Sequence, residues 1–277
     1  GAGPGIETRR YMVRKLILES LKFYVKEYNV DGFRFDLMGF MDQDIMQLIR
    51  QEVGQIYNSK NVNELILQGE AWVFSDLDTS MEAKGINAAT TKINHVSENL
   101  NIGFFNDTSR DSYTGRLEQR GFVQGEVNEM DRVAAGVIGG LKGYKLGAIS
   151  FNTDRFNNSY NLFAEYPNNC LNYLSIHDGL TLSDKINASW SDSSGFVRAR
   201  MMKQANVLLF TSQGKIILHG GDEILRTKPL SNVDKEKNRA INTIYTDIEE
   251  GVQYFHENSY CSSDYTNMFR WDRLNNQ

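Results

Sequence analysis

The sequence predicts an α/β fold built on a parallel sheet, and two observations support this. Short apolar segments alternate along the chain with segments of helical periodicity, and several of the apolar segments end in an acidic residue. Alternating strands and helices are typical of parallel sheets. Two architectures fit this order, an open doubly wound sheet and a (βα)8 barrel. The 277 residues, 40% of them hydrophobic, suffice for one large domain or two smaller ones.

The predicted helices rest on apolar residues spaced three or four positions apart. The clearest spans residues 9–28, where a single face carries apolar side chains and charged residues lie between them. That face consists of Val13, Ile17, Leu21, Tyr24 and Tyr28. Further helices are predicted over residues 42–57, 129–141 and 197–212.

The predicted strands are short apolar runs, and four of the five end in an acid. They span residues 30–36, 65–70, 102–107, 171–178 and 215–219, and the terminal acids are Asp36, Glu70, Asp107 and Asp178. Catalytic groups of (βα)8 barrels lie at the carboxyl ends of different strands, so this pattern favours a barrel. No glycine-rich phosphate loop follows any of these strands, which disfavours a nucleotide-binding protein.

The composition excludes several classes of partner. The chain has 35 Asp and Glu residues but 30 Lys and Arg residues, and its basic residues form no stripe. We therefore expect no nucleic-acid partner. No apolar run approaches the roughly 18 residues of a membrane span, so we expect no membrane partner. Residues 1–5 lack the apolar core of a secretory signal, and we expect a cytoplasmic protein.

Neither a metal site nor a cofactor is expected. The two cysteines, Cys170 and Cys261, are far apart in sequence, which argues against a disulfide framework and against a zinc site. The four histidines are scattered along the chain, at positions 95, 177, 219 and 256.

Asp36 and Glu70 are one strand–helix unit apart, so a parallel sheet would place them at neighbouring strand ends. Hydrolysis of a glycosidic bond needs two carboxyl groups, which lie roughly 5 Å apart in retaining enzymes. Each acid also has a simpler interpretation. An acid after a strand often caps the next helix, and Arg34, on the same strand face as Asp36, could be an ordinary ion-pair partner.

Three short segments carry a resemblance to a known family. They are residues 30–39, 69–72 and 175–179, which read VDGFRFDLMG, GEAW and SIHDG. In order and spacing they resemble the second, third and fourth signature segments of type I pullulanases, glycogen and starch debranching enzymes of the α-amylase superfamily. Residues 102–107, 121–125, 212–214 and 219–223 resemble further family segments. Two residues differ from the usual signature sequences of the family: Ala71 replaces a glycine and Gly179 replaces an asparagine.

The resemblance implies a role for each of three catalytic carboxylates. Asp36 would be the nucleophile that forms a covalent glycosyl intermediate. Glu70 would act first as the general acid and then as the general base. Asp178 would stabilise the transition state by binding sugar hydroxyls.

The resemblance also implies three substrate-binding side chains. Arg34 would hold Asp36 ionised and oriented. His177 would donate a hydrogen bond to the sugar in the same subsite. Trp72 would offer a flat apolar face to a sugar ring, although a partly buried packing role is the alternative.

One family segment has no counterpart where it is expected. The first signature segment precedes the nucleophile strand in the family, and nothing before residue 30 matches it; residues 94–95, Asn-His, lie too late in the chain. The resemblance thus implies that residues 1–255 form the C-terminal portion of a catalytic (βα)8 barrel, about strands 4 to 8. Residues 256–277 would begin the passage to a C-terminal β-domain. The N-terminal barrel half would come from the full-length protein, and without it we expect low stability and no activity.

The implied function is that of a retaining glycoside hydrolase acting on α-1,6-glucosidic branch linkages. Its substrate and partner would be a branched α-glucan polysaccharide or oligosaccharide, such as pullulan, starch or glycogen. Two alternatives stay open. One is an isoamylase-like or oligo-1,6-glucosidase-like α-glucan hydrolase, and the other is a carbohydrate-binding fragment without catalysis.

Overall fold

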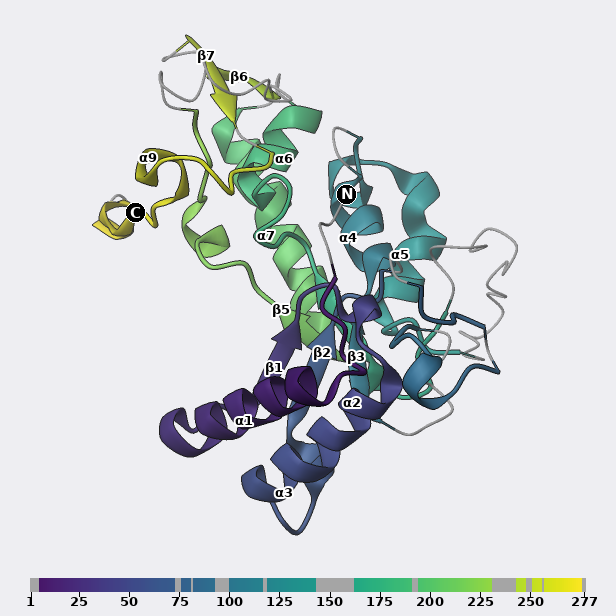
Figure 1. The fold of residues 1–277 in the computed structure, drawn as a ribbon. Helices are drawn as coiled ribbons and strands as arrows, with labels where there is room; N and C mark the ends of the chain where they lie inside the picture. The colour runs from purple at the N-terminus through teal and green to yellow at the C-terminus, as the bar shows by residue number, and fades with distance from the viewer. Residues whose placement is uncertain are drawn as a thin grey trace. The chain divides into compact units, whose positions relative to one another are not determined.

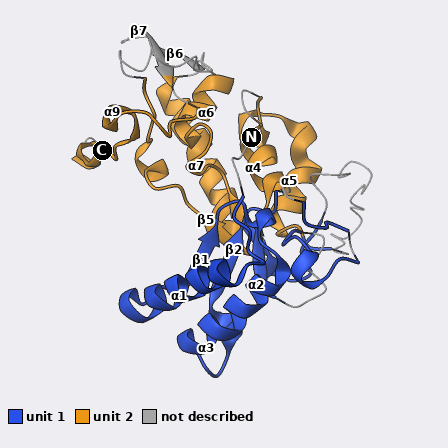
Figure 2. Ribbon diagram, viewed as in Figure 1, with its two compact units in different colours: residues 1–105, 141–144, 162–171 blue, residues 106–140, 145–161, 172–277 orange. Residues whose placement is uncertain are grey.

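The computed structural model describes ten stretches of the chain, which form two compact units (Figures 1 and 2). The first unit comprises residues 1–105, 141–144 and 162–171, and the second comprises residues 106–140, 145–161 and 172–277. The described stretches are residues 5–72, 76–80, 82–92, 100–116, 119–142, 162–190, 194–230, 243–247, 251–255 and 257–275.

Five strands form one sheet in the order β1-β2-β3-β4-β5, and the pairs from β1 to β4 are parallel. The predicted parallel sheet is therefore confirmed. A separate antiparallel pair, β6 with β7, was not predicted. The strands are β1 (Gly32–Phe35), β2 (Ile66–Gly69), β3 (Ile102–Phe105), β4 (Cys170–Tyr173), β5 (Lys215–Ile217), β6 (Thr243–Asp247) and β7 (Gly251–Phe255).

The helices match the predicted ones in position, with α4, α6 and α9 in addition. The α-helices are α1 (Tyr11–Tyr28), α2 (Gln43–Leu48), α3 (Gly54–Tyr57), α4 (Asp107–Thr114), α5 (Met130–Val137), α6 (Leu182–Ser189), α7 (Gly195–Thr211) and α9 (Asp264–Asn267). A π-helical turn, Ile49–Val53, joins α2 to α3. Short 3-10 turns cover Met38–Phe40, Val62–Glu64, Gly85–Asn87, Phe122–Gln124, Val127–Glu129, Pro167–Asn169, Asp222–Ile224 and Trp271–Asn275.

In the first unit, α1 and α2–α3 pack beside the sheet and bury one face of its strands (Figure 1). Phe33 and Phe35 of β1 pack against this helix-side core, which includes Leu67 of β2 and Phe104 of β3. Because side chains alternate along a strand, Arg34 points to the opposite face. That face is where the polar site lies.

The prediction of which residues form the apolar face of α1 is partly wrong. Ile17 and Leu21 pack against the core as expected, but Tyr24 and Tyr28 are exposed, and the buried residues are Leu18 and Val25. Both tyrosines form edge contacts with the exposed ring of Phe23. Large amphipathic rings can satisfy helical periodicity without being buried, so periodicity alone misjudged the last turns.

Two predicted boundaries also shift. The helix predicted to reach residue 141 ends at Val137, because Gly139 and Gly140 adopt positive φ angles of 69° and 61°. The strand predicted over residues 171–178 ends at Tyr173. Asp178 therefore lies in a loop beyond the strand, and not at its last position.

Arg50 connects the segments of the first unit. It is 4% exposed, and its guanidinium donates hydrogen bonds to the carbonyl oxygens of Val62, Leu65, Leu100 and Asn101 at 2.5–3.1 Å. Burial lowers its pKa to about 10. One side chain thus fixes the turns that lead into β2 and β3.

We expect Arg50→Met to destabilise the protein by about 3 kcal/mol, because the carbonyl groups lose their donors inside the fold. Urea denaturation followed by circular dichroism measures the change. Lys60→Met is the matched control, because Lys60 is exposed, and it should change stability by less than about 0.5 kcal/mol. Equal unfolding midpoints for the two variants would contradict the role given to Arg50.

Candidate active site

The centre of the site is the guanidinium of Arg34, which contacts two carboxylates. Its Nη1 lies 2.5 Å from Oδ1 of Asp36, and its Nη2 lies 2.6 Å from Oε1 of Glu70. The parallel register places Arg34 beside Gln68 and Phe35 beside Gly69. The two acids that follow these strands therefore end on the same side of the sheet, within reach of one arginine.

This shared arginine limits the distance between the two acids. Both terminal nitrogens belong to one planar guanidinium, so the contacting oxygens of Asp36 and Glu70 lie within about 8 Å of each other. Carboxyl pairs of glycosidases are separated by about 5 to 9.5 Å, the shorter distances belonging to retaining enzymes. The arrangement is compatible with this chemistry.

The two carboxylates occupy different environments. The Glu70 side chain is 5% exposed, whereas the Asp36 side chain is 63% exposed. Glu70 also accepts a hydrogen bond at Oε2 from the backbone N–H of Leu37, at 2.8 Å. Leu37 has a φ of 44°, so a left-handed residue in the turn after β1 directs this N–H at Glu70. Two acids in unlike surroundings can divide the acid and nucleophile roles.

The arginine is itself supported from a third strand. Its guanidinium carbon lies 5.4 Å from the ring centroid of Phe105 on β3, a cation–π contact. The sequence indicated that Arg34 would pair with Asp36. It did not reveal the bond to Glu70, the Leu37 amide or the Phe105 ring, because all three depend on strand register and turn geometry.

Trp72 follows β2 and is partly buried. The ammonium of Lys92 lies 5.7 Å from its ring centroid and 4.8 Å from that of Phe163. The Trp72 ring thus already contacts a cation, and its predicted stacking on a sugar stays a prediction.

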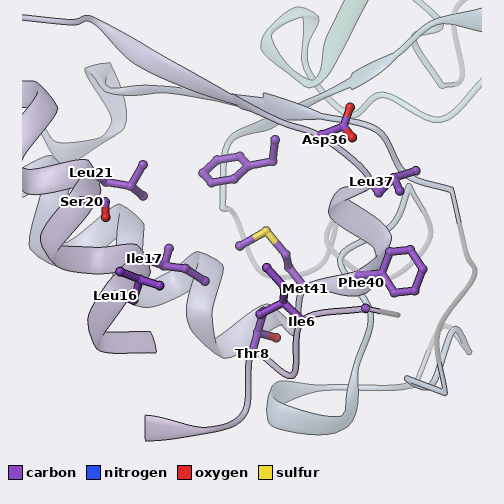
Figure 3. Close-up of a pocket in the computed structure, with 12 residues that line it drawn as sticks. Ile6, Thr8, Leu16, Ile17, Ser20, Leu21, Asp36, Leu37, Phe40 and Met41 are labelled. Atoms are coloured by element: carbon purple, nitrogen blue, oxygen red, sulfur yellow. The ribbon is translucent and has the colours of Figure 1, made fainter. Parts of the chain in front are cut away.

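An apolar pocket of about 450 Å³ lies next to Asp36 in the first unit (Figure 3). Figure 3 shows Asp36 and Phe40 at one side of it and Leu16 and Ile17 of α1 at the other. Among the described residues of its lining, Thr8 and Ser20 are the polar side chains besides Asp36. Sugars need several hydrogen-bonding groups, so this largely apolar lining is poorly suited to bind one.

His177 and Asp178 belong to the second unit. Their side chains are about half exposed, and His177 Nε2 lies 3.8 Å from Asp178 Oδ2. Asp36 and Glu70 belong to the first unit, so the convergence of Asp178 with them stays a prediction.

The fourth acid noted at a strand end, Asp107, belongs to a buried polar network. Its Oδ1 accepts a hydrogen bond from the hydroxyl of Tyr173 at 2.6 Å and lies 3.7 Å from Arg110 Nη1. Arg110 also contacts Asp111 at 2.6 Å. These contacts give Asp107 a role in the packing of β4 against α4.

The stretches that the structure describes show neither a metal site nor a membrane-spanning helix. No group of three or more His, Cys, Asp or Glu side chains there is arranged to hold a metal ion. Within the same stretches no helix combines the length and the apolarity that crossing a membrane requires. The Asn-His pair at residues 94–95 and the histidine at position 256 lie outside the described residues.

Comparison with known proteins places this geometry in context. The pullulanase of Bacillus subtilis (strain 168) is 29% identical over 278 residues, which is 99% of this chain and 31% of that protein. Pullulanase 1, chloroplastic, of Arabidopsis thaliana is 30% identical over 260 residues, covering 80% of this chain and 26% of that protein. The crystal structure of pullulanase type I from Bacillus subtilis str. 168 complexed with maltose superposes with a TM-score of 0.71 and 26% identity, over 97% of this chain. No protein-family model matches the chain.

The fold and the sequence together define a chain of the (βα)8-barrel class. Its five parallel strands correspond to part of the pullulanase barrel, which confirms the predicted fold class. The chain is similar to pullulanases over nearly its whole length, which confirms the resemblance that its three signature segments indicated. It spans about 31% of the length of the Bacillus subtilis relative.

A double-mutant cycle can measure how Arg34 divides its interaction between the two acids. We expect a coupling free energy of about 2–3 kcal/mol between Arg34 and buried Glu70, and less than about 1 kcal/mol between Arg34 and exposed Asp36. The variants are Arg34→Met, Glu70→Gln, Asp36→Asn and the two pairs that include Arg34→Met, with unfolding free energies from urea titrations. Equal couplings, or a larger one with Asp36, would contradict the geometry described here.

Proposed function

We propose that this chain carries the catalytic carboxylates of a retaining hydrolase that cleaves α-1,6-glucosidic branch linkages in α-glucans. The observation that supports this most strongly is the pairing of Asp36 and Glu70 on one arginine, in segments that resemble pullulanase signatures. The relatives are named pullulanases, and one was crystallised with maltose. Branched glucans such as pullulan, starch or glycogen are therefore the proposed substrates.

In the proposed mechanism, Asp36 attacks the anomeric carbon while Glu70 protonates the departing oxygen. The exposure of Asp36 leaves its carboxylate accessible to a sugar, and Arg34 keeps it oriented. A water molecule then hydrolyses the glycosyl-enzyme, with Glu70 removing its proton. This step releases the sugar, restores the Asp36 carboxylate and leaves Glu70 protonated for the next turnover.

The remaining roles concern the sugar. Asp178 and His177 would bind its hydroxyls and support the charge that develops in the transition state. Trp72 would pack against a ring. The half-exposed side chains of Asp178 and His177 and the partly buried ring of Trp72 allow such contacts.

The domain organisation is likewise a proposal. We assign residues 1–255 to the catalytic barrel and residues 256–277 to the passage toward a β-domain. Since the chain corresponds to 31% of the Bacillus subtilis relative, we propose that polypeptide equivalent to the other barrel strands takes part in activity on glucans. The experiments below therefore use the protein that carries this chain.

Glu70→Gln should lose activity on pullulan by more than about 1000-fold, because the α-1,6 branch oxygen leaves poorly without a proton. The same variant should lose far less in the release of fluoride from α-maltosyl fluoride, since fluoride leaves without protonation. Reducing-sugar and fluoride assays measure the two rates.

The matched control is Glu64→Gln, an exposed acid that lies just before β2. It should retain nearly full activity on both substrates. Equal losses on pullulan and on the fluoride for Glu70→Gln would contradict the acid role. Release of glucose from short α-1,6 oligosaccharides without action on pullulan would favour the oligo-1,6-glucosidase alternative.

A further inference from the structure

The loop that carries His177 and Asp178 is held at both ends by buried polar groups of the second unit. Ser175 is 6% exposed and stands at its start, and Gly179 stands at its end. Both anchors come from the segment after β5, at residues 219–228. A half-exposed acid is thus presented by a short loop with fixed ends.

From these contacts we propose that Lys228 is a positioning residue for Asp178, holding the loop in the conformation that presents His177 and Asp178 to a glucan. This inference rests on the proposed function, because it assigns those two side chains to sugar binding. It adds a residue to which the sequence analysis gave no role.

The first anchor is a chain of hydrogen bonds that ends on a buried acid. Ser175 Oγ donates to Asp222 Oδ2 at 2.9 Å and lies 3.3 Å from His219 Nδ1. His219 Nε2 lies 3.3 Å from Arg226 Nη1, which can only donate. Burial lowers the pKa of His219 to about 4, so the ring is neutral and its Nδ1–H donates to Ser175. Burial raises the pKa of Asp222 to about 7, and above that pH its carboxylate can only accept from Ser175, so the direction of every bond in the chain is defined there.

The second anchor is Lys228, whose side chain is almost fully buried. Its ammonium donates to the carbonyl oxygen of Gly179, next to Asp178, and to that of Glu257 at 3.0 Å. Its backbone N–H donates to Asp184 Oδ2 on α6 at 2.8 Å. Lys228 thereby ties the end of the loop to α6 and to residue 257.

A buried, charged Lys228 is better explained by a role in positioning the loop than by a contribution to folding stability. Burial of an ammonium costs several kcal/mol unless its donors are satisfied, and an apolar side chain would avoid that cost. The charged groups that act on it are Asp178, Asp184 and Glu257, which favour the ammonium, and Arg226, which opposes it. Burial lowers the Lys228 pKa to about 8.

Gly179 explains why the anchor is placed at its carbonyl. Its φ is 74°, a conformation that other residues rarely adopt, while an added Cβ would meet no atom within 4 Å. A glycine is thus required here because of the positive φ angle, and not because a larger side chain would clash with its neighbours. Because this turn sets where Asp178 points, a cation fixed to the Gly179 carbonyl stabilises that direction.

The experiment compares maltotriose binding by Lys228→Met, Lys228→Arg and the wild type between pH 6 and 10, using NMR titrations. The ammonium is present below its pKa and lost above it, so wild-type affinity should fall as pH rises through about 8. At pH 7, Lys228→Met should bind about tenfold more weakly and lack this pH step. Lys228→Arg should stay within about threefold of the wild type and keep its affinity to pH 10.

Lys203→Met is the control, because Lys203 is an exposed lysine of α7 in the same unit, and it should match the wild type. Wild-type affinity and an unchanged pH step in Lys228→Met would overturn the proposal. If that variant does not fold, a pH step near 8 that persists in Lys228→Arg would overturn it instead.

A second readout separates this inference from the proposed function. The backbone amide signal of Gly179 should titrate near pH 8 in the wild type and not in Lys228→Arg, whether or not a sugar binds. Wild-type protein that shows this titration but binds no maltotriose would contradict the proposed function without contradicting the contact between Lys228 and Gly179. A Gly179 amide that titrates identically in both proteins would contradict the anchor.

Discussion

The candidate site depends on a single guanidinium placed between two carboxylates. Asp36 and Glu70 are 34 positions apart in sequence, yet Arg34 contacts both at 2.5 and 2.6 Å because β1 and β2 are parallel neighbours in a fixed register. A shift of that register by one residue would turn Glu70 to the other face of the sheet. The helix-side core, against which the partly buried Phe33 and Phe35 pack on either side of Arg34, holds this register in place.

Two different kinds of support surround the acids in the two units. In the first unit Arg34 contacts both acids, a backbone amide contacts Glu70, and an aromatic ring supports the arginine. In the second unit the acid Asp178 is half exposed, and buried groups such as Ser175 and Lys228 act on the loop around it. Both arrangements hold a carboxylate in place through its neighbours, which is what preorganised catalysis requires.

Much of this could be predicted from the sequence, because periodicity and strand ends are local properties. The five parallel strands, α1 and the helical stretch from Gln43 to Tyr57 lie where the apolar patterns indicated. The exposure of Tyr24 and the early end of β4 could not be predicted, since each depends on what packs nearby. The role of Lys228 could not be predicted, because in the sequence a lone lysine in a loop cannot be distinguished from an ordinary surface lysine until its carbonyl partners are known.

The central claim is that Asp36 is the nucleophile of a retaining reaction, and a covalent trap tests it most directly. A fluorinated maltosyl fluoride that slows the second step should accumulate the glycosyl-enzyme. Peptide mass spectrometry should then find one added glycosyl group on the peptide that contains Asp36, and none in Asp36→Asn. A label on another carboxylate, or turnover of the fluoride without any covalent adduct, would contradict the account.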